Sequence, residues 1–212
     1  MKKIFTLLLA FIATSQLHAQ SVENIQFMHA GYQMEGSIYK PAGQGPYRTI
    51  VIIPGSGAND RKGTLPMQGG YVPCLYPLLI NETLYPYHEL ATGLQNKGYA
   101  VVTYDKFEYT HSSIPADSIT FERLWLPAQS LIQHLKTRSD IKSQELVLIG
   151  HSEGSYIIPY LAKQDADIQQ LISIGGGAQP FDTLLATQLV QFARQCQGDT
   201  TTALMQSQQI LA

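Results

Sequence analysis

The sequence predicts an α/β protein with a mostly parallel central sheet flanked by helices. Three apolar runs rich in β-branched residues indicate strands that are buried on both faces. Segments with helical periodicity separate these runs, and strands that alternate with helices favour a parallel sheet. The three runs are TIVII at 49–53, AVVTY at 100–104 and ELVLI at 145–149.

The other elements follow from the same two periodicities. Apolar residues between 120 and 137 recur three and four positions apart, which predicts an amphipathic helix that Pro127 kinks or splits. A second helix shows an apolar face from Tyr87 to Leu94 and has Gly98 as its stop signal. The remaining expected elements are strands at 25–28, 36–39 and 171–174, a helix at 155–163, and a helix carrying Leu185, Leu189, Phe192 and Cys196.

The first nineteen residues have the layout of a secretory signal peptide. Two lysines precede an apolar stretch from Ile4 to Thr14, and Leu17-His18-Ala19 then offers a cleavage site. The apolar stretch is too short to anchor the protein in a membrane. We therefore expect residues 1–19 to direct export to a periplasm or beyond; an amphipathic N-terminal helix is the alternative.

Composition excludes several classes of protein. Of the 212 residues, 44% are hydrophobic and 14% are charged, which supplies a sizeable core and excludes global disorder. Fourteen Lys and Arg against sixteen Asp and Glu give a net charge of −2, so no nucleic-acid partner is expected. No apolar run reaches about 18 residues, so no membrane-spanning helix is expected. Cys74 and Cys196 either pair, as export would permit, or stay as two free thiols.

One motif points to chemistry. Gly150-His151-Ser152-Glu153-Gly154 is a G-x-S-x-G pentapeptide between a predicted strand and a predicted helix. A nucleophile elbow requires this setting, because a sharp strand-to-helix turn lifts the serine hydroxyl clear of the sheet. The glycines allow close backbone approach, and the helix N-terminus presents N–H groups to a developing oxyanion. The alternative is a glycine-rich turn whose serine only caps the helix.

Three segments together resemble the α/β-hydrolase superfamily, and within it exported bacterial serine esterases of the carboxylesterase type. They are GHSEG after ELVLI, VIIPGSGANDRKG at 51–63 and AVVTYDK at 100–106, and the resemblance covers roughly residues 22–185. It implies that Ser152 is the nucleophile and forms an acyl-enzyme with a small-molecule carboxylic ester. It also implies an oxyanion hole made by two backbone N–H groups, those of Glu153 and Ser56.

The resemblance further implies a catalytic acid and then a histidine after the nucleophile. No histidine follows His151, and no predicted strand remains to carry the acid. We therefore expect the chain to lack the family's C-terminal strands, its acid and its base, with a core at 20–179 and the start of a helical lid at 180–212. His151 should pack beside the elbow instead of acting as the base. A base borrowed from His29, His88, His111 or His134 is the alternative.

Several residues near the motifs are candidates for supporting roles. Asp60-Arg61 should form an ion pair or clamp its loop. Asp105-Lys106 resembles the family's strand-end D-K-R-G motif, with Phe107-Glu108 where the family has Arg-Gly. Four tyrosines either line an acyl or alcohol pocket or belong to ordinary packing. These tyrosines are Tyr71, Tyr76, Tyr85 and Tyr87.

No cofactor or metal is expected. Asp60 stands where a dinucleotide-binding fingerprint after Gly55 and Gly57 would have Gly or Ala. No segment matches the phosphate-binding G-x-x-x-x-G-K-[ST] pattern or the zinc-binding H-E-x-x-H pattern. The leading hypothesis is a serine esterase. The alternatives are a serine peptidase or acyltransferase of the same fold, and a non-catalytic fragment that binds without the triad; the oligomeric state stays open.

Overall fold

The computed structural model describes residues 19–68, 72–113, 120–196 and 198–211. Except for Ala19, the expected signal peptide lies outside the described residues, and so does Tyr71. No helix within the described ranges is long and apolar enough to cross a membrane.

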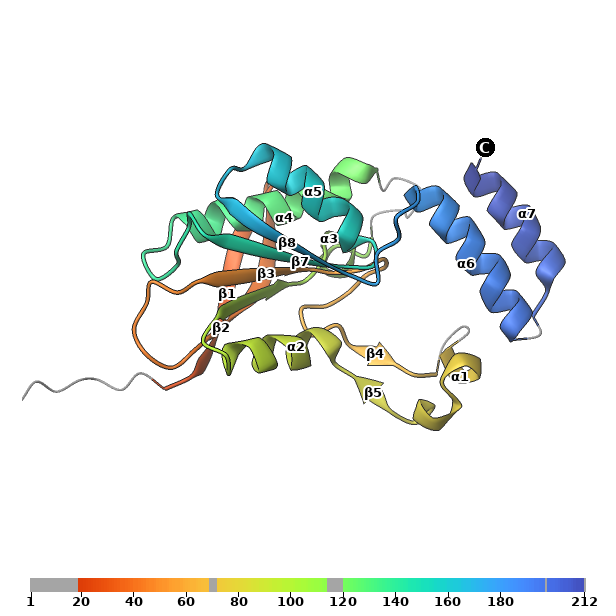
Figure 1. Ribbon diagram of the computed structural model, residues 1–212, viewed down its shortest axis with the longest axis horizontal. Coiled ribbons are helices and arrows are strands. Elements are labelled where there is room, and N and C mark those ends of the chain that lie inside the picture. Colours follow the sequence, from red (N-terminus) through yellow and green to blue (C-terminus); the bar gives the residue numbers. More distant parts are fainter. Residues whose placement is uncertain (1–18, 69–71, 114–119, 197, 212) are drawn as a thin grey trace, which may run out of the picture.

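Six strands form the central sheet in the described part of the chain, in the order β1-β2-β6-β3-β7-β8 (Figure 1). β1 and β2 form an antiparallel hairpin at one edge, and β2 runs antiparallel to β6. The other four strands are parallel to one another, so the predicted sheet type is confirmed. The bounds are β1 Ser21–His29, β2 Tyr32–Lys40, β3 Thr49–Ile53, β6 Ala100–Tyr104, β7 Leu146–His151 and β8 Ile168–Ile174.

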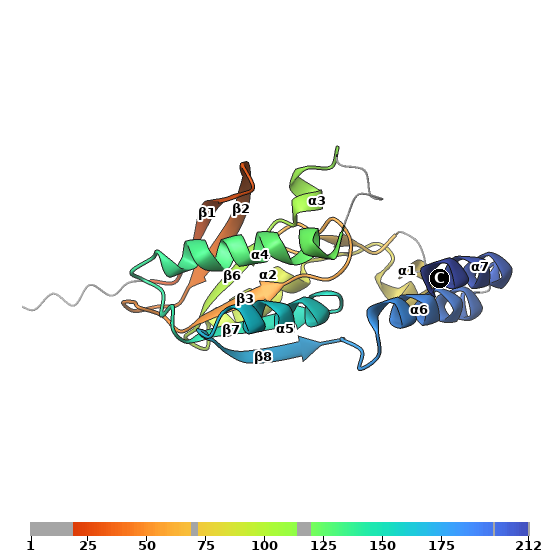
Figure 2. The same ribbon diagram turned by 90° about the horizontal axis from the view of Figure 1, so that it is seen from above.

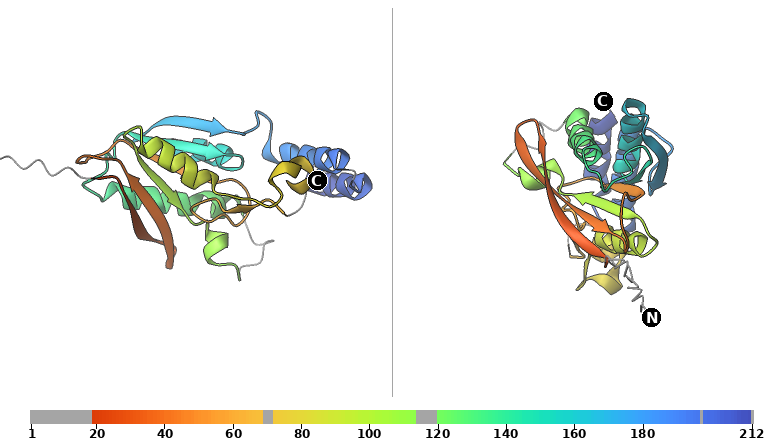
Figure 3. Two further views of the ribbon diagram at one scale, coloured as in Figure 1. Left: turned by 90° about the horizontal axis from the view of Figure 1, so that it is seen from below. Right: turned by 90° about the vertical axis from the view of Figure 1, so that its left-hand side faces the viewer.

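Helices cover both faces of this sheet. α4 (Phe121–Lys136) and α5 (Gly154–Gln164) lie on one face (Figure 2), and α2 (Pro86–Gln95) lies on the other (Figure 3). Val51 and Ile53 of β3 belong to the core under α4 and α5, whereas Ile50 and Ile52 belong to the core under α2. Because successive side chains of a strand point to opposite faces, a strand covered on both sides is apolar throughout.

Pro127 lies inside α4 without splitting it. A helix-interior proline removes one backbone hydrogen bond, and here the proline is buried with Ala128 and Leu131 on the face that packs against the sheet. The burial of that face outweighs the lost bond. The predicted helix is therefore confirmed, and of the two effects expected of Pro127, a kink or a split, the split does not occur.

The connection between β3 and α2 contains structure that periodicity did not predict. Two short strands, β4 (Leu65–Pro66) and β5 (Thr83–Leu84), form an antiparallel ribbon. Between them lie α1 (Val72–Leu75) and a 3-10 helix, η1 (Pro77–Leu79). Strands of two residues are too short to show an alternation in sequence, which is why the ribbon was missed.

Two helices follow β8 and extend beyond the carboxyl ends of the parallel strands (Figures 1 and 2). They are α6 (Phe181–Gln195) and α7 (Thr200–Leu211), and they pack against each other. Cys74 of α1 and Cys196 after α6 form a disulfide, with their Cα atoms 5.7 Å apart. Of the two alternatives for these cysteines, the structure has the paired one, and it joins the ribbon segment covalently to the end of α6.

Four charged side chains tie the antiparallel edge of the sheet to the segment after α4. Arg138 contacts carboxylate oxygens of Glu23 and Asp140 at 2.9 Å each. Lys40 Nζ lies 2.5 Å from Glu23 and 2.7 Å from Asp140. The hydrogen bonds from Arg138 and Lys40 lower the pKa of Asp140 to about 2, against the opposing effect of desolvation.

This network predicts a pH dependence of stability. The folded-state pKa of Asp140 is depressed, so its contribution is present above about pH 4 and is lost as the pH falls through about 2. We expect Asp140→Asn to lower the free energy of unfolding at neutral pH by about 1–2 kcal/mol at low salt, after allowance for solvent screening. Urea unfolding at a series of pH values measures this effect. The exposed Glu89→Gln serves as control, and identical pH profiles for Asp140→Asn and the unaltered protein would contradict the prediction.

Candidate active site

β7 and α5 meet at a sharp turn that carries Ser152. The φ of Ser152 is +51°, in the left-handed region that residues with a side chain rarely adopt. The sheet holds this turn in place, because the Ser152 N–H donates to the carbonyl oxygen of Ile174 at the end of β8, at 2.9 Å. The pentapeptide therefore adopts the strand–turn–helix arrangement that the sequence predicts for a nucleophile elbow.

Steric contacts explain both glycines of the pentapeptide. A Cβ on Gly150 would lie 2.4 Å from the carbonyl oxygen of Gly154. A Cβ on Gly154 would lie 2.2 Å from the carbonyl oxygen of Ile53, the last residue of β3. Any larger residue at either position would push α5 away from the strand ends, and the elbow would open.

The loop after β3, Pro54–Gly57, lies directly beside the elbow. A Cβ on Gly55 would be 3.2 Å from the Cβ of Ser152. Gly55 is buried, and Ser56 is exposed. Among the described residues, no acceptor takes up the backbone N–H of Ser56 or of Glu153. The structure thus brings together the two segments whose N–H groups the sequence analysis assigns to an oxyanion hole; the assignment itself stays a prediction.

A buried ion pair connects this loop to the start of α5. Lys106 Nζ lies 2.8 Å from Glu153 Oε1 and donates to the carbonyl oxygen of Gly55 at 3.1 Å. Lys106 is 4% exposed and Glu153 is 7% exposed. The sequence predicts a role only for the backbone N–H of Glu153, and it does not predict this ion pair. A usable signal was the placement of both charges just after largely apolar strands, since a buried charge requires a partner.

Tyr87 at the start of α2 contacts the same loop, Pro54–Gly57, through its hydroxyl group. Its hydroxyl oxygen accepts the N–H of Gly55 at 2.8 Å and lies 3.0 Å from Nδ1 of His151. Desolvation lowers the pKa of His151, which favours the neutral imidazole, and burial raises the pKa of Tyr87. A neutral His151 can accept a hydrogen bond from the Tyr87 hydroxyl at Nδ1. His151 therefore packs beside the elbow, as predicted, with its ring edge-on to Tyr87.

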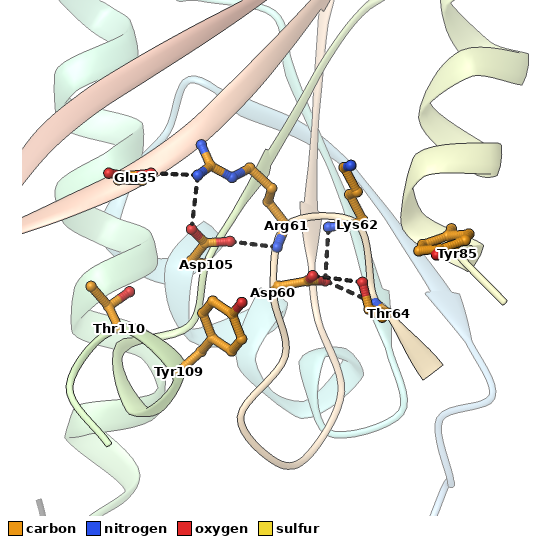
Figure 4. A pocket seen from close by; sticks show the side chains of 9 residues that line it. All are labelled: Glu35, Asp60, Arg61, Lys62, Thr64, Tyr85, Asp105, Tyr109 and Thr110. Carbon is orange, nitrogen blue, oxygen red and sulfur yellow. Dashed lines mark hydrogen bonds and ion pairs between the residues drawn. The ribbon is translucent and has the colours of Figure 1, made fainter. Parts of the chain in front are cut away.

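Arg61 lies in the loop that follows Pro54–Gly57, and Figure 4 shows it between the carboxylates of Glu35 and Asp105. Its guanidinium contacts Glu35 and lies 3.2 Å from Asp105 Oδ2, and its N–H donates to Asp105 Oδ1 at 2.6 Å. Burial raises the pKa of Asp105 despite the neighbouring arginine. Asp60 instead accepts hydrogen bonds from Lys62 and Thr64. The expected loop clamp is confirmed, but Asp60 and Arg61 each use other partners.

Two cavities flank these residues. A polar one of about 750 Å³ lies over the Arg61 clamp and includes Tyr85 (Figure 4). An apolar one of about 410 Å³ is lined by Tyr87 and His151 and lies between α2, the β4–β5 ribbon and the strand ends of the central sheet. Two of the four candidate tyrosines, Tyr76 and Tyr87, line the apolar cavity. Its other lining residues are Ile52, Leu65, Met67, Leu79, Leu84, Pro86, Leu90, Ile149, His151 and Ile174.

The histidines considered as a borrowed base have other contacts. His29 is hydrogen-bonded to Ser130 and His88 to Tyr39, each at 2.9 Å. The rings of His111 and His134 contact the rings of Phe107 and Phe27, respectively.

The aspartates after Ser152 also have other partners. Asp165 and Asp167 pair with Lys136, and Asp182 and Asp199 accept hydrogen bonds at helix starts. Within the described ranges, no three His, Cys, Asp or Glu residues gather as a metal site would require.

Comparison with solved structures decides the fold. The chain is similar to dienelactone hydrolase from Anabaena variabilis, with a TM-score of 0.53 at 16% identity, over 75% of this chain and 65% of that one. It is also similar to the α/β-hydrolase GrgF from a Penicillium species, with a TM-score of 0.52 at 14% identity, over 82% of this chain and 54% of that one. The chain has the α/β-hydrolase fold. Ser152 follows the carboxyl end of β7 and precedes α5, and a strand-to-helix turn of this kind is where the fold carries its nucleophile elbow.

The chain is also similar to a curated protein that is named an esterase. Esterase EstD from Thermotoga maritima is 25% identical over 159 residues, which make up 74% of this chain and 33% of EstD. The chain thus spans about a third of the length of that relative. No family model matches the chain.

The backbone conformation of the elbow predicts an unusual order of variant stabilities. Ser152→Gly and Ser152→Ala both remove the hydroxyl, but only glycine adopts φ +51° without steric cost. We expect Ser152→Gly to exceed Ser152→Ala in free energy of unfolding by about 0.5–1 kcal/mol. Urea unfolding measures the difference. At Ser143, which is not among the residues with positive φ, the order should reverse, and the same order at both sites would rule out strain at the elbow.

Proposed function

We propose that the protein is a serine hydrolase that cleaves carboxylic esters through an acyl-enzyme on Ser152. The observation that carries this proposal is the elbow: Ser152 lies at φ +51° between a parallel strand and a helix. The neighbouring loop contributes a backbone N–H without an acceptor among the described residues. The similarity to EstD, which is named an esterase, supports ester cleavage over other reactions of this fold.

The proposed reaction has two halves. Ser152 Oγ attacks the ester carbonyl carbon, its proton passes to a histidine, and the C–O bond to the alcohol breaks as the alcohol takes that proton. Water then attacks the acyl carbon and gives a proton to the histidine, the C–O bond to Ser152 breaks as Oγ takes that proton back, and the carboxylic acid leaves. The Ser56 and Glu153 N–H groups would hold the oxyanion in both halves, each worth about 3 kcal/mol of transition-state stabilisation.

The catalytic acid and histidine are proposed to come from a C-terminal part of the protein that this chain does not contain. The contacts of the histidines and aspartates described above support this, because those side chains are engaged away from Ser152. In this proposal α6 and α7 begin a helical cap, and the further strands would pair with β8 at the edge of the sheet.

We also propose that the protein is exported and that residues 1–19 are its signal peptide. The disulfide between Cys74 and Cys196 supports this location, because disulfides persist in oxidising compartments such as a periplasm. The substrate is proposed to be a small-molecule ester. Its acyl or alcohol group would enter the apolar cavity, whose size and lining are typical of a ligand pocket.

The nucleophile assignment predicts a large effect of one substitution. In the full-length gene product, Ser152→Ala should lower kcat on short-chain p-nitrophenyl esters by at least about a thousandfold, because no acyl-enzyme can form. Release of p-nitrophenol measures the rate, and labelling by a fluorophosphonate, analysed by peptide mass spectrometry, should locate on Ser152 in the unaltered protein. Unchanged ester turnover in Ser152→Ala would overturn the proposal. Faster turnover of peptide amides than of esters would favour a peptidase. The absence of any labelling by the fluorophosphonate would favour a non-catalytic role.

The apolar cavity predicts the acyl-chain preference. Leu79→Trp adds bulk on its wall, so we expect kcat/KM for octanoyl esters to fall about tenfold or more while acetyl esters change little. The neighbouring Leu78→Trp is the control, because Leu78 is 95% exposed and does not line the cavity. Kinetics across a series of acyl lengths provide the measurement. An equal effect of both variants on all lengths would show that the substrate does not use this cavity.

A further inference from the structure

We propose that Lys106 is a positioning residue of the oxyanion hole. Its ammonium group holds the Gly55–Ser56 peptide unit against the start of α5, and it thereby sets the orientation of the Ser56 N–H. This inference rests on the proposed function, because it assigns a role in stabilising the oxyanion that forms at Ser152.

The argument begins with a single peptide unit. The carbonyl of Gly55 and the N–H of Ser56 belong to the same planar group, and in a trans peptide they point in opposite directions. Lys106 Nζ donates to that carbonyl at 3.1 Å from the buried side of the loop. A fixed carbonyl therefore turns the N–H toward the exposed side, where a substrate oxygen would lie.

The second contact of Lys106 relates this peptide unit to the other proposed donor. Nζ lies 2.8 Å from the Glu153 carboxylate, and the backbone N–H of Glu153 is the second group of the proposed oxyanion hole. One ammonium group thus contacts both segments that carry the donors. Further anchoring acts on either side of it, since the Lys106 N–H donates to the carbonyl of Asn59 at 2.9 Å and Tyr87 holds the preceding peptide unit.

Charge distinguishes Lys106 from the neutral donor at the same carbonyl. The Asn59 amide also reaches Gly55 O, at 3.0 Å, but its two hydrogens are shared among the carbonyls of Gly55, Ser56 and Gly57. A charged donor in a buried site makes a stronger hydrogen bond and polarises the peptide unit that it binds. The Ser56 N–H at the other end of that unit becomes a better donor to a developing negative charge.

A purely stabilising role would not require these residues. Buried ion pairs are weak contributors to stability, and apolar residues of similar volume often replace them without loss. The Lys106–Glu153 pair is nevertheless buried at the junction of the loop and the elbow, with its cation on a carbonyl that faces away from solvent. Positioning of the donors accounts for that location.

The test compares the full-length protein with three variants at this site. Lys106→Met removes the ammonium but leaves Glu153 buried without its cation, so the double variant Lys106→Met/Glu153→Gln provides a second form without an unpaired charge. We expect both to lower kcat on p-nitrophenyl acetate by about tenfold or more, with KM changed less than about threefold. Affinity for phenylboronic acid, whose serine adduct places an oxygen in the oxyanion position, should fall by a similar factor. Lys106→Arg, which retains a charged donor, should recover part of kcat.

The control is a lysine with a partly exposed ion pair away from the site. Lys136 contacts Asp165 and Asp167 at 2.6 Å and 2.5 Å near the end of α4, and Lys136→Met should leave kcat within about twofold. The inference is overturned if the folded double variant keeps its kcat and its affinity for phenylboronic acid while Ser152→Ala is inactive. Full ester turnover by Ser152→Ala would overturn the proposed function itself, and this inference with it.

Discussion

The arrangement of the site depends on the close approach of α5 to the end of β3. The backbone at Gly154 passes so near the carbonyl of Ile53 that a Cβ there would lie 2.2 Å from the oxygen. This contact places the turn with Ser152 against Gly55, and it holds Glu153 where its carboxylate meets Lys106. If α5 moved outward to admit a side chain, the nucleophile, the loop and the ion pair would separate together.

The sequence was informative where one element carried its own signal. β3 and β6 have the predicted bounds, because a strand covered on both faces is buried from end to end and is therefore largely apolar. The elbow could be located because its glycines, its serine and the flanking strand and helix lie within a short segment. Three other elements have too weak a sequence pattern to be predicted. β4 and β5 are two residues long, and α7 has little apolar periodicity to distinguish it from a loop.

The contacts of the candidate site that the sequence did not predict join residues far apart in the chain. Tyr87 was predicted to lie on the apolar face of a helix and either to line a pocket or to pack in the core, whereas its hydrogen bond to Gly55 joins residues 32 positions apart. Lys106 was recognised as part of a motif, but its two partners lie 51 and 47 positions away. Asp105 and Lys106 are adjacent after β6 but contact different segments. Asp105 accepts a hydrogen bond from the backbone N–H of Arg61, and Lys106 forms an ion pair with Glu153 of the elbow. Residue type and spacing identify such groups as charged and buried, but the choice of partner follows from the order of strands in the sheet.

The disulfide has a consequence for the covalent integrity of the protein. Cys74 and Cys196 are 122 positions apart, so the bond encloses α2, the strands β5 to β8 and the elbow in one covalent ring. A single cut by a protease anywhere in that ring opens it without releasing a fragment, and the two pieces stay joined until a reductant separates them. In an extracellular setting, damage of this kind would leave the loop, the nucleophile and α6 on one connected molecule, and it would become visible as two chains only after reduction.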